Sequence, residues 1–268
     1  MAYTTINKST DHFITHLYTG NDSTNNQTSL GMTPDLVWVK CRNHATPSHY
    51  WVDKVRGDKK YISSNATTAE QTDGNTFDLV SGGFNLAGGN GWTNVSGRTY
   101  ASWNWKAGGA GSSNTEGNIT ATVSANTTSG FSIIKFTSAG SVSQTYGHGL
   151  NGTPKLWIIK DTSTSSNNWQ VYYNGTNRLK LDTDEGSSTT ASQLMSANAT
   201  TITTPSYSDS AWGNGNGVNY ITYAFQEIQG FSKIGTYTGN GNADGTFVYT
   251  GFKPAFVLIK SVSTTNWN

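Results

Sequence analysis

One short pattern occurs three times in this chain, and the repetition limits the possible folds more than any other feature. Each copy has a proline, one variable residue, four large apolar residues and a lysine. The copies run from Pro34 to Lys40, from Pro154 to Lys160 and from Pro254 to Lys260. A pattern that recurs in this way is typical of tandem copies of one structural unit.

Aromatic residues flank the repeated pattern at similar distances. A phenylalanine precedes each proline by 21 to 23 residues, and a tryptophan follows each proline by 13 to 17 residues. The phenylalanines are Phe13, Phe131 and Phe231. Because a residue present in every copy serves the fold first, we expect core roles for the repeated tryptophans. The structural repeat positions are Pro34, Trp51, Pro154, Trp169, Pro254 and Trp267.

The repeat divides the chain into five parts. We predict an N-terminal segment over residues 1–12, a first module over 13–108 and a Gly- and Ser-rich connector over 109–130, with one candidate strand from Ile119 to Val123. A second module follows over 131–230, and the start of a third, incomplete module lies over 231–268. Either a longer chain or a second chain would complete the third module, and we favour a longer chain.

The local patterns favour an all-β fold. The four apolar residues of the motif are typical of a short strand that is buried on both faces, with a proline placed before it and a lysine that reaches solvent at its end. Residues 131–136 and 219–225 are further predicted strands. Turn signals at intervals of about 8–12 residues favour tandem β-sandwich modules of the jelly-roll or concanavalin-like type.

The composition argues for a folded, self-packing protein. Gly, Ser, Thr and Asn are abundant, which alone would permit disorder, but aromatic residues make up 12% of the chain and include nine tryptophans. The net charge is only +1, so we expect no nucleic-acid partner and little repulsion between copies. The longest apolar runs are too short to insert into a membrane, and the N-terminus lacks a signal-peptide pattern.

The sequence offers little for catalysis. Hydrolases need paired carboxylates or a nucleophile with a base. The one acidic cluster, Asp182 to Glu185, lacks the later glutamate of a calcium loop and is typical of a solvated turn. His148 has no acidic or cysteine neighbour, which favours a turn or packing role. We therefore expect a non-enzymatic protein with no catalytic residue, no metal site and no cofactor.

Two loops place tryptophan beside asparagine. Trp92 and Asn94 lie before the last predicted strand of the first module. Trp212, Asn214 and Asn216 lie at a similar point in the second module. An indole can stack on a sugar ring while amides bond its hydroxyls, so these five residues form a hypothetical glycan-binding set. The alternative is that both tryptophans fold back over the end of a sandwich.

Several longer strings resemble modules found in virion proteins of marine tailed phages. They are Ala2-Tyr-Thr-Thr-Ile-Asn-Lys8, Pro34-Asp-Leu-Val-Trp-Val-Lys40, Asp53-Lys-Val-Arg-Gly57, Ala101-Ser-Trp-Asn-Trp-Lys-Ala-Gly-Gly109, Tyr237-Thr-Gly-Asn-Gly241 and Tyr249-Thr-Gly-Phe-Lys-Pro254. The resemblance covers most of the chain and is to tail-fibre or surface-fibre proteins with concanavalin-like repeats. The second copy departs from it, because it has no counterpart of the Asp53 to Gly57 string.

The resemblance implies a structural virion component, in a tail or head fibre, that contributes to host-surface attachment. It further implies a homotrimer that contacts other virion proteins and a host surface glycan. Such a protein is made in the host cytoplasm without a signal peptide and ends up on the virion surface. A stand-alone carbohydrate-binding, lectin-like module is the alternative. A glycan-degrading spike is a third possibility, which the lack of a carboxylate pair opposes.

Overall fold

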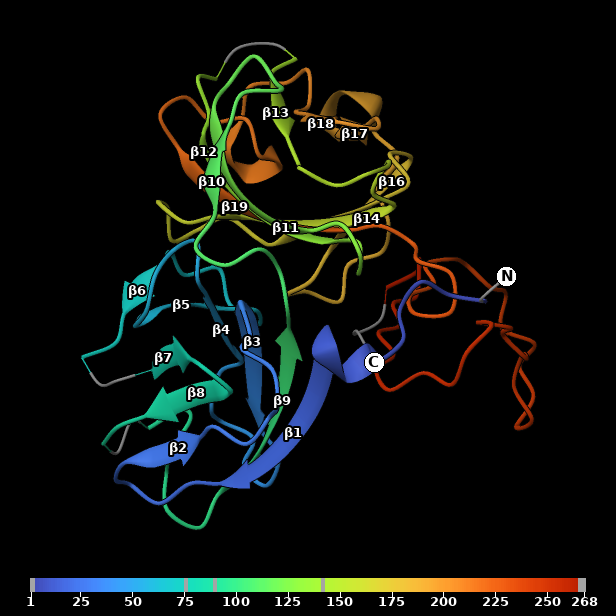
Figure 1. Ribbon diagram of the computed structural model, residues 1–268. Helices are drawn as coiled ribbons and strands as arrows, with labels where there is room; N and C mark the ends of the chain where they lie inside the picture. The colour runs from blue at the N-terminus through green and yellow to red at the C-terminus, as the bar shows by residue number, and fades with distance from the viewer. Residues whose placement is uncertain (1–2, 75–76, 89–90, 141–142, 265–268) are drawn as a thin grey trace.

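The computed structural model describes residues 3–74, 77–88, 91–140 and 143–264, and it confirms the all-β prediction (Figure 1). The helical elements in this part of the chain are three single 3-10 turns, at Ser9–Asp11, Ala191–Gln193 and Ser210–Trp212. The strands form four antiparallel sheets, two large and two small.

The first module contains one large and one small sheet. The large sheet has the order β1 (Phe13–Thr19), β9 (Thr99–Trp105), β3 (Leu36–Cys41), β4 (Tyr50–Asp53), β5 (Lys60–Ser63) and β6 (Gln71–Thr72). The small sheet has the order β2 (Asn25–Gln27), β8 (Gly83–Leu86) and β7 (Phe77–Val80). A core of apolar side chains fills the space between the two sheets.

The second module repeats this plan. Its large sheet has the order β10 (Ser112–Asn114), β11 (Ala121–Asn126), β12 (Phe131–Thr137), β19 (Asn219–Phe225), β14 (Leu156–Asp161), β15 (Gln170–Tyr173) and β16 (Asn177–Lys180). Its small sheet has the order β13 (Thr145–Gly147), β18 (Thr201–Thr203) and β17 (Ser196–Ala197). Strands β12, β19, β14, β15 and β16 follow the order of β1, β9, β3, β4 and β5, so the structure bears out the repeat.

The prediction of a connector is wrong, because residues 109–130 contribute two strands to the second module, although the second of them overlaps the candidate strand at residues 119–123. Strand β11 pairs with β12 along its whole length, from Ala121 opposite Phe136 to Asn126 opposite Phe131. Glycine here reflects close packing rather than flexibility. A Cβ atom on Gly117 would collide with the backbone of Thr145.

The strand register corrects the alignment of the repeated tryptophans. Trp38 pairs with Trp51, whereas Ile158, the matching residue of the second motif, pairs with Val171. Trp169 therefore lies two positions before the counterpart of Trp51. A shift of two residues keeps a side chain on the same face of a strand. Both tryptophans are fully buried, so the predicted core role is confirmed although the predicted equivalence is wrong.

The two large sheets pack face to face and share one core. Leu36 and Trp38 point into this shared core from the first module, as do Leu156 and Ile158 from the second. The alternate residues of the same strands point the other way, toward the small sheet of their own module. The result is four stacked layers of sheet (Figure 1), in which the motif strands are buried on both faces as predicted.

The third repeat adds to the edge of the shared core. The ring of Phe256, at the position that matches Leu36, lies 5.6 Å from the ring of Trp105 and 6.3 Å from that of Trp38. Leu258 packs against the same core. Among the described residues no named strand follows β19, and Pro254 is exposed whereas Pro34 and Pro154 are buried. Pro254 therefore lacks the buried setting of its two counterparts, and Trp267, with its predicted core role, lies outside the described residues.

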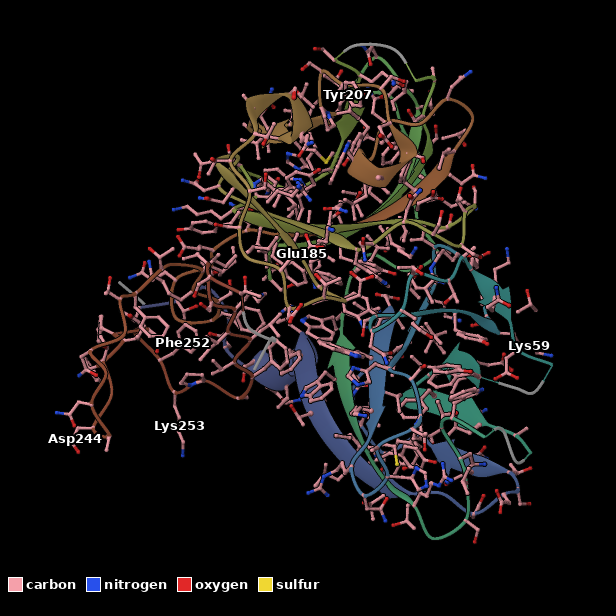
Figure 2. All side chains as sticks on the ribbon, turned by 180° about the vertical axis from the view of Figure 1, so that it is seen from behind. Lys59, Glu185, Tyr207, Asp244, Phe252 and Lys253 are labelled. Carbon is pink, nitrogen blue, oxygen red and sulfur yellow. The ribbon has the colours of Figure 1, made fainter. Side chains whose placement is uncertain are left out.

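The N-terminal segment runs beside the third repeat (Figure 1). The hydroxyl of Tyr3 donates to the carbonyl oxygen of Gly251 at 3.0 Å, and the ring of His12 lies 5.9 Å from that of Phe231. Asp244, Phe252 and Lys253 lie on the part of the third repeat that stands off from the two modules (Figure 2).

Candidate functional site

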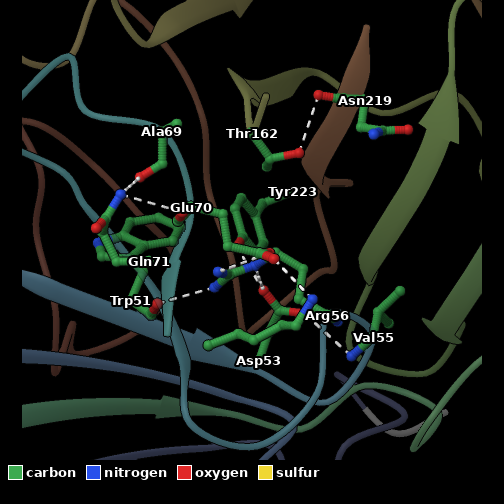
Figure 3. Close-up of polar contacts among 11 residues, drawn as sticks. Trp51, Asp53, Val55, Arg56, Ala69, Glu70, Gln71, Thr162, Asn219 and Tyr223 are labelled. Atoms are coloured by element: carbon green, nitrogen blue, oxygen red, sulfur yellow. Dashed lines mark hydrogen bonds and ion pairs between the residues drawn. The ribbon is translucent and has the colours of Figure 1, made fainter. Parts of the chain in front are cut away.

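The Asp53 to Gly57 string lies where the two modules meet. Asp53 ends β4 and Arg56 lies in the turn that follows, and their side chains are 0% and 1% exposed. One carboxylate oxygen of Asp53 accepts from the backbone N–H groups of Val55 (3.0 Å) and Arg56 (2.9 Å). The other accepts from Nε of Arg56 (2.5 Å) and from the hydroxyl of Tyr223 (2.7 Å) (Figure 3). Four hydrogen bonds therefore offset the cost of burying this charge.

Arg56 is less completely bonded than Asp53. Its Nη2 donates to the backbone carbonyl of Trp51 at 2.8 Å, while its buried Nη1 makes no hydrogen bond and lies 3.6 Å from a carboxylate oxygen of Glu70. Burial opposes the charge of Arg56, but the nearby Asp53, Tyr223 and Glu70 outweigh it and raise the pKa of the guanidinium. Arg56 therefore stays charged and holds unused donor capacity.

Tyr223 brings the second module to this network. It lies on β19, and its ring meets the ring of Trp51 edge-on at a centroid distance of 4.7 Å. Burial, together with the charge of Asp53, raises the pKa of the phenol well above its usual value, although Arg56 acts in the opposite direction. The hydroxyl therefore remains a donor and ties β19 to the turn after β4.

A cavity of about 280 Å³ lies next to this network. Both modules line it (Figure 3 shows Arg56 and Glu70 on one side, Thr162 and Asn219 on the other). The amine of Lys60 lies 2.8 Å from a carboxylate oxygen of Glu70, and the backbone N–H of Glu70 donates to the carbonyl of Thr162 at 3.1 Å. The polar side chains of the cavity wall include Arg56, Lys60, Glu70, Lys135, Ser163 and Asn219.

The structure does not support Asn94 as a ligand residue. Its side chain is buried, and its amide nitrogen donates to the carbonyl oxygens of Ser23 (2.7 Å) and Gly88 (3.1 Å). Its amide oxygen accepts from the backbone N–H of Asn21 (3.1 Å) and from the side chain of Asn25 (2.9 Å). Asn94 therefore organises three loops, and the hypothesis that it binds a glycan is wrong.

Asn214 has the same structural role in the second module. It is fully buried, donates to the carbonyl of Pro205 at 3.0 Å and accepts from the side chains of Ser138 (3.2 Å) and Gln144 (2.5 Å). In each module the residue after the asparagine donates its backbone N–H to a tyrosine hydroxyl. After Asn94 this hydrogen bond reaches Tyr100 at 3.0 Å, and after Asn214 it reaches Tyr220 at 2.9 Å. Asn214 is thus the counterpart of Asn94 in the repeat, and like Asn94 it is not a ligand residue. The equal spacing from each asparagine to its tyrosine was the signal that could have shown this.

The remaining residues of the two loops differ in exposure. Trp92 is 42% exposed, and its ring lies 6.2 Å from that of Tyr50. Trp212 is half-buried, with the guanidinium of Arg178 over its ring at 3.9 Å, so the fold-back alternative holds for this residue. Asn216 is exposed. The structure therefore leaves Trp92 and Asn216 as accessible members of the predicted set.

The histidine and the acidic cluster have ordinary structural partners. His148 is buried, its Nδ1 accepts from the backbone N–H of Leu150 (3.1 Å) and its Nε2 lies 3.2 Å from the carbonyl of Asn198. Burial lowers its pKa, so it remains neutral. Asp182 accepts from the side chain of Asn168 and the backbone of Trp169. In the described part of the chain, no three His, Cys, Asp or Glu side chains are grouped to hold a metal ion.

Comparison with known proteins gives one match. Residues 8–268 match the model of a family described as a domain of unknown function (DUF7483). The chain belongs to this family. No curated protein and no solved structure matches it. The family match spans both modules and the third repeat, so the shared core lies within one family unit.

No helix in the described ranges is both long and apolar enough to cross a membrane. Sequence reasoning also missed the junction of the modules as a site. The signal was the Asp53 to Gly57 string, which the second copy lacks. By strand register Asp53 matches Tyr173, because each pairs with the first residue of its motif strand, so only one module contributes the ion pair.

Proposed function

We propose that this chain is a non-enzymatic structural component of a tailed-phage virion, in a tail or head fibre, that contributes to attachment at the host surface. In this proposal it forms a homotrimer, contacts other virion proteins and lies on the particle surface. The resemblance of its repeats to phage fibre modules supports the biological setting. The exposed apolar face of the third repeat is the structural observation that carries the proposal.

That face corresponds to a core surface in the other two modules. Val257 and Ile259 are 59% and 37% exposed, whereas Val37 and Val39, at the matching positions, are 0% and 1% exposed. Phe247 and Tyr249 of the same segment are 85% and 73% exposed. Exposed apolar side chains of this size are typical of a protein interface. The face therefore favours assembly with another polypeptide chain.

The chemistry of the junction also favours a structural role. The carboxylate of Asp53 is held by four hydrogen bonds and that of Glu70 by Lys60. The four hydrogen bonds to Asp53 occupy the acceptor sites of both its oxygens, so this carboxylate has no site left to take a proton from a substrate. This observation supports a binding or assembly function over hydrolysis.

The test is the solution mass of the chain by multi-angle light scattering. We expect a trimer, and we expect the paired variant Val257→Asp and Ile259→Asp to shift the mass toward the monomer without changing the circular dichroism spectrum. Leu17→Asp is the matched control, because Leu17 is 57% exposed but lies on β1 of the first module. A monomeric wild-type chain would contradict the proposed homotrimer.

A lectin-like module is the second candidate, and the exposed ring of Trp92 favours it. This function predicts that Trp92→Ala abolishes binding on a glycan array while the mass remains unchanged. Equal glycan binding by the variant and the wild type would remove Trp92 from consideration.

A further inference from the structure

The cavity at the junction combines a small volume with walls from both modules. Arg56, Lys60 and Glu70 come from the first module, and Lys135, Ser163 and Asn219 come from the second. Its volume of about 280 Å³ is just below the range of about 300–1,000 Å³ that is usual for small-molecule sites. A single sugar residue or a small acid suits a space of this size, whereas an oligosaccharide does not.

The charges that line the cavity leave one positive charge without a carboxylate partner. Arg56 is paired with Asp53, and Lys60 is paired with Glu70 at 2.8 Å. Lys135, on β12, has no ion pair with any described residue. The cavity therefore has an excess of about one positive charge, which suits a ligand with a single negative charge.

Several polar groups of the wall have hydrogen-bond donors that remain unused. Nη1 of Arg56 is buried and makes no hydrogen bond. The oxygen of Ser163 already accepts from the backbone N–H of Asn219 at 3.0 Å, which leaves its hydroxyl hydrogen to donate. The amide oxygen of Asn219 accepts from Thr137 at 2.6 Å, which leaves its NH₂ group to donate. A ligand for this wall must therefore supply acceptors.

We propose that the junction cavity binds the carboxylate of an acidic sugar, such as a uronic acid. A carboxylate is an acceptor with one charge, and its hydrogen bonds to arginine and lysine are among the strong ones in proteins. The ring hydroxyls of the sugar face Ser163 and Asn219. This inference names a ligand class for the attachment role and rests on the proposed function for its biological meaning.

The experiment is isothermal titration calorimetry of the full chain with sodium glucuronate, and with glucose at the same concentrations as the neutral counterpart. We expect glucuronate to bind and glucose not to bind. Lys135→Gln should weaken glucuronate binding at least tenfold, and Asn219→Asp should weaken it further, because it replaces a donor with a negative charge. Both residues line the cavity and are exposed, so the folded state should tolerate the changes.

Lys253→Gln is the matched control. Lys253 is also exposed and has no ion pair among the described residues, but it lies on the third repeat (Figure 2). Its replacement should leave glucuronate binding unchanged. Equal loss in the Lys253 and Lys135 variants would show a nonspecific charge effect and overturn the site.

Inorganic phosphate forms the third arm of the titration. Binding of phosphate without glucuronate would overturn the assignment to a sugar acid, and binding of neither would overturn the site. The result is separate from the test of assembly. A monomer that binds glucuronate would contradict only the trimer, and a trimer that binds no glucuronate would contradict only this inference.

Discussion

Lys160 has an unusual environment for a motif residue that was expected to reach solvent. Its side chain is fully buried, so that expectation is wrong for the second motif, while Lys40 of the first is half-buried. The amine of Lys160 donates to the carbonyl oxygens of Thr67 (2.9 Å) and Asn167 (2.8 Å). Because Thr67 belongs to the first module, this lysine spans the junction. Burial lowers its pKa to about 8, against the opposing effect of Asp161 and Asp182.

The shifted pKa of Lys160 predicts a rise in stability with pH. Between about pH 8 and 10 the unfolded chain binds a proton that the folded chain has released, since an unfolded lysine has a pKa of about 10.4. The free energy of unfolding should therefore rise by about 2 kcal/mol across this window. Urea titrations at pH 7.5, 8.5 and 9.5 measure it. Lys160→Met should flatten the rise, and an identical slope in the variant would contradict the assignment.

The buried loop asparagines should contribute to stability and not to ligand binding. Asn94→Ala and Asn214→Ala each remove several hydrogen bonds and leave buried partners unsatisfied, so we expect each to lower the free energy of unfolding by about 2–3 kcal/mol. Asn216→Ala is the matched control and should cost less than about 0.5 kcal/mol, because the side chain is exposed. Thermal melts of the three variants test this, and equal melting temperatures would contradict it.

The motif strand should respond differently in the first and third repeats. Val37→Ser places a hydroxyl in a sealed core and should cost about 2–3 kcal/mol at any chain concentration. Val257→Ser changes an exposed residue, so its cost should be close to zero in dilute solution and grow with chain concentration as assembly covers the face. Denaturant melts over a hundredfold concentration range distinguish the two. A fixed cost for Val257→Ser would contradict the role of this face in assembly.

The elements differ in how far the sequence revealed them. The strand Leu36–Cys41 was predictable because large apolar residues at consecutive positions require two buried faces. The strand Ala121–Asn126 was predicted only in part, as a candidate strand inside a connector, because its small and polar residues give a weak pattern beside many glycines. The junction site was out of reach, because Asp53 and Tyr223 are 170 residues apart and meet only through the packing of two sheets.

At the scale of the whole molecule, the shared core makes the two modules dependent on each other. Tyr223→Phe removes one hydrogen bond to the buried Asp53 and should cost about 1–2 kcal/mol, within a single cooperative unfolding transition. Tyr173→Phe is the matched control, because Tyr173 is only half-buried and makes no side-chain hydrogen bond in the described structure; its cost should be small. Two separate transitions, by fluorescence and by circular dichroism, would contradict the shared core.

The tryptophans at the junction also provide an intrinsic spectroscopic probe of how the two modules pack. The indole of Trp38 lies 5.1 Å from that of Trp51 and 5.0 Å from that of Trp103, and Trp51 lies 5.2 Å from Trp169 of the other module. Indoles this close couple their electronic transitions and give a distinct near-ultraviolet circular dichroism signal. The Trp51 and Trp169 part of that signal arises only when the modules meet. The docking of the two halves can therefore be followed in time without any label.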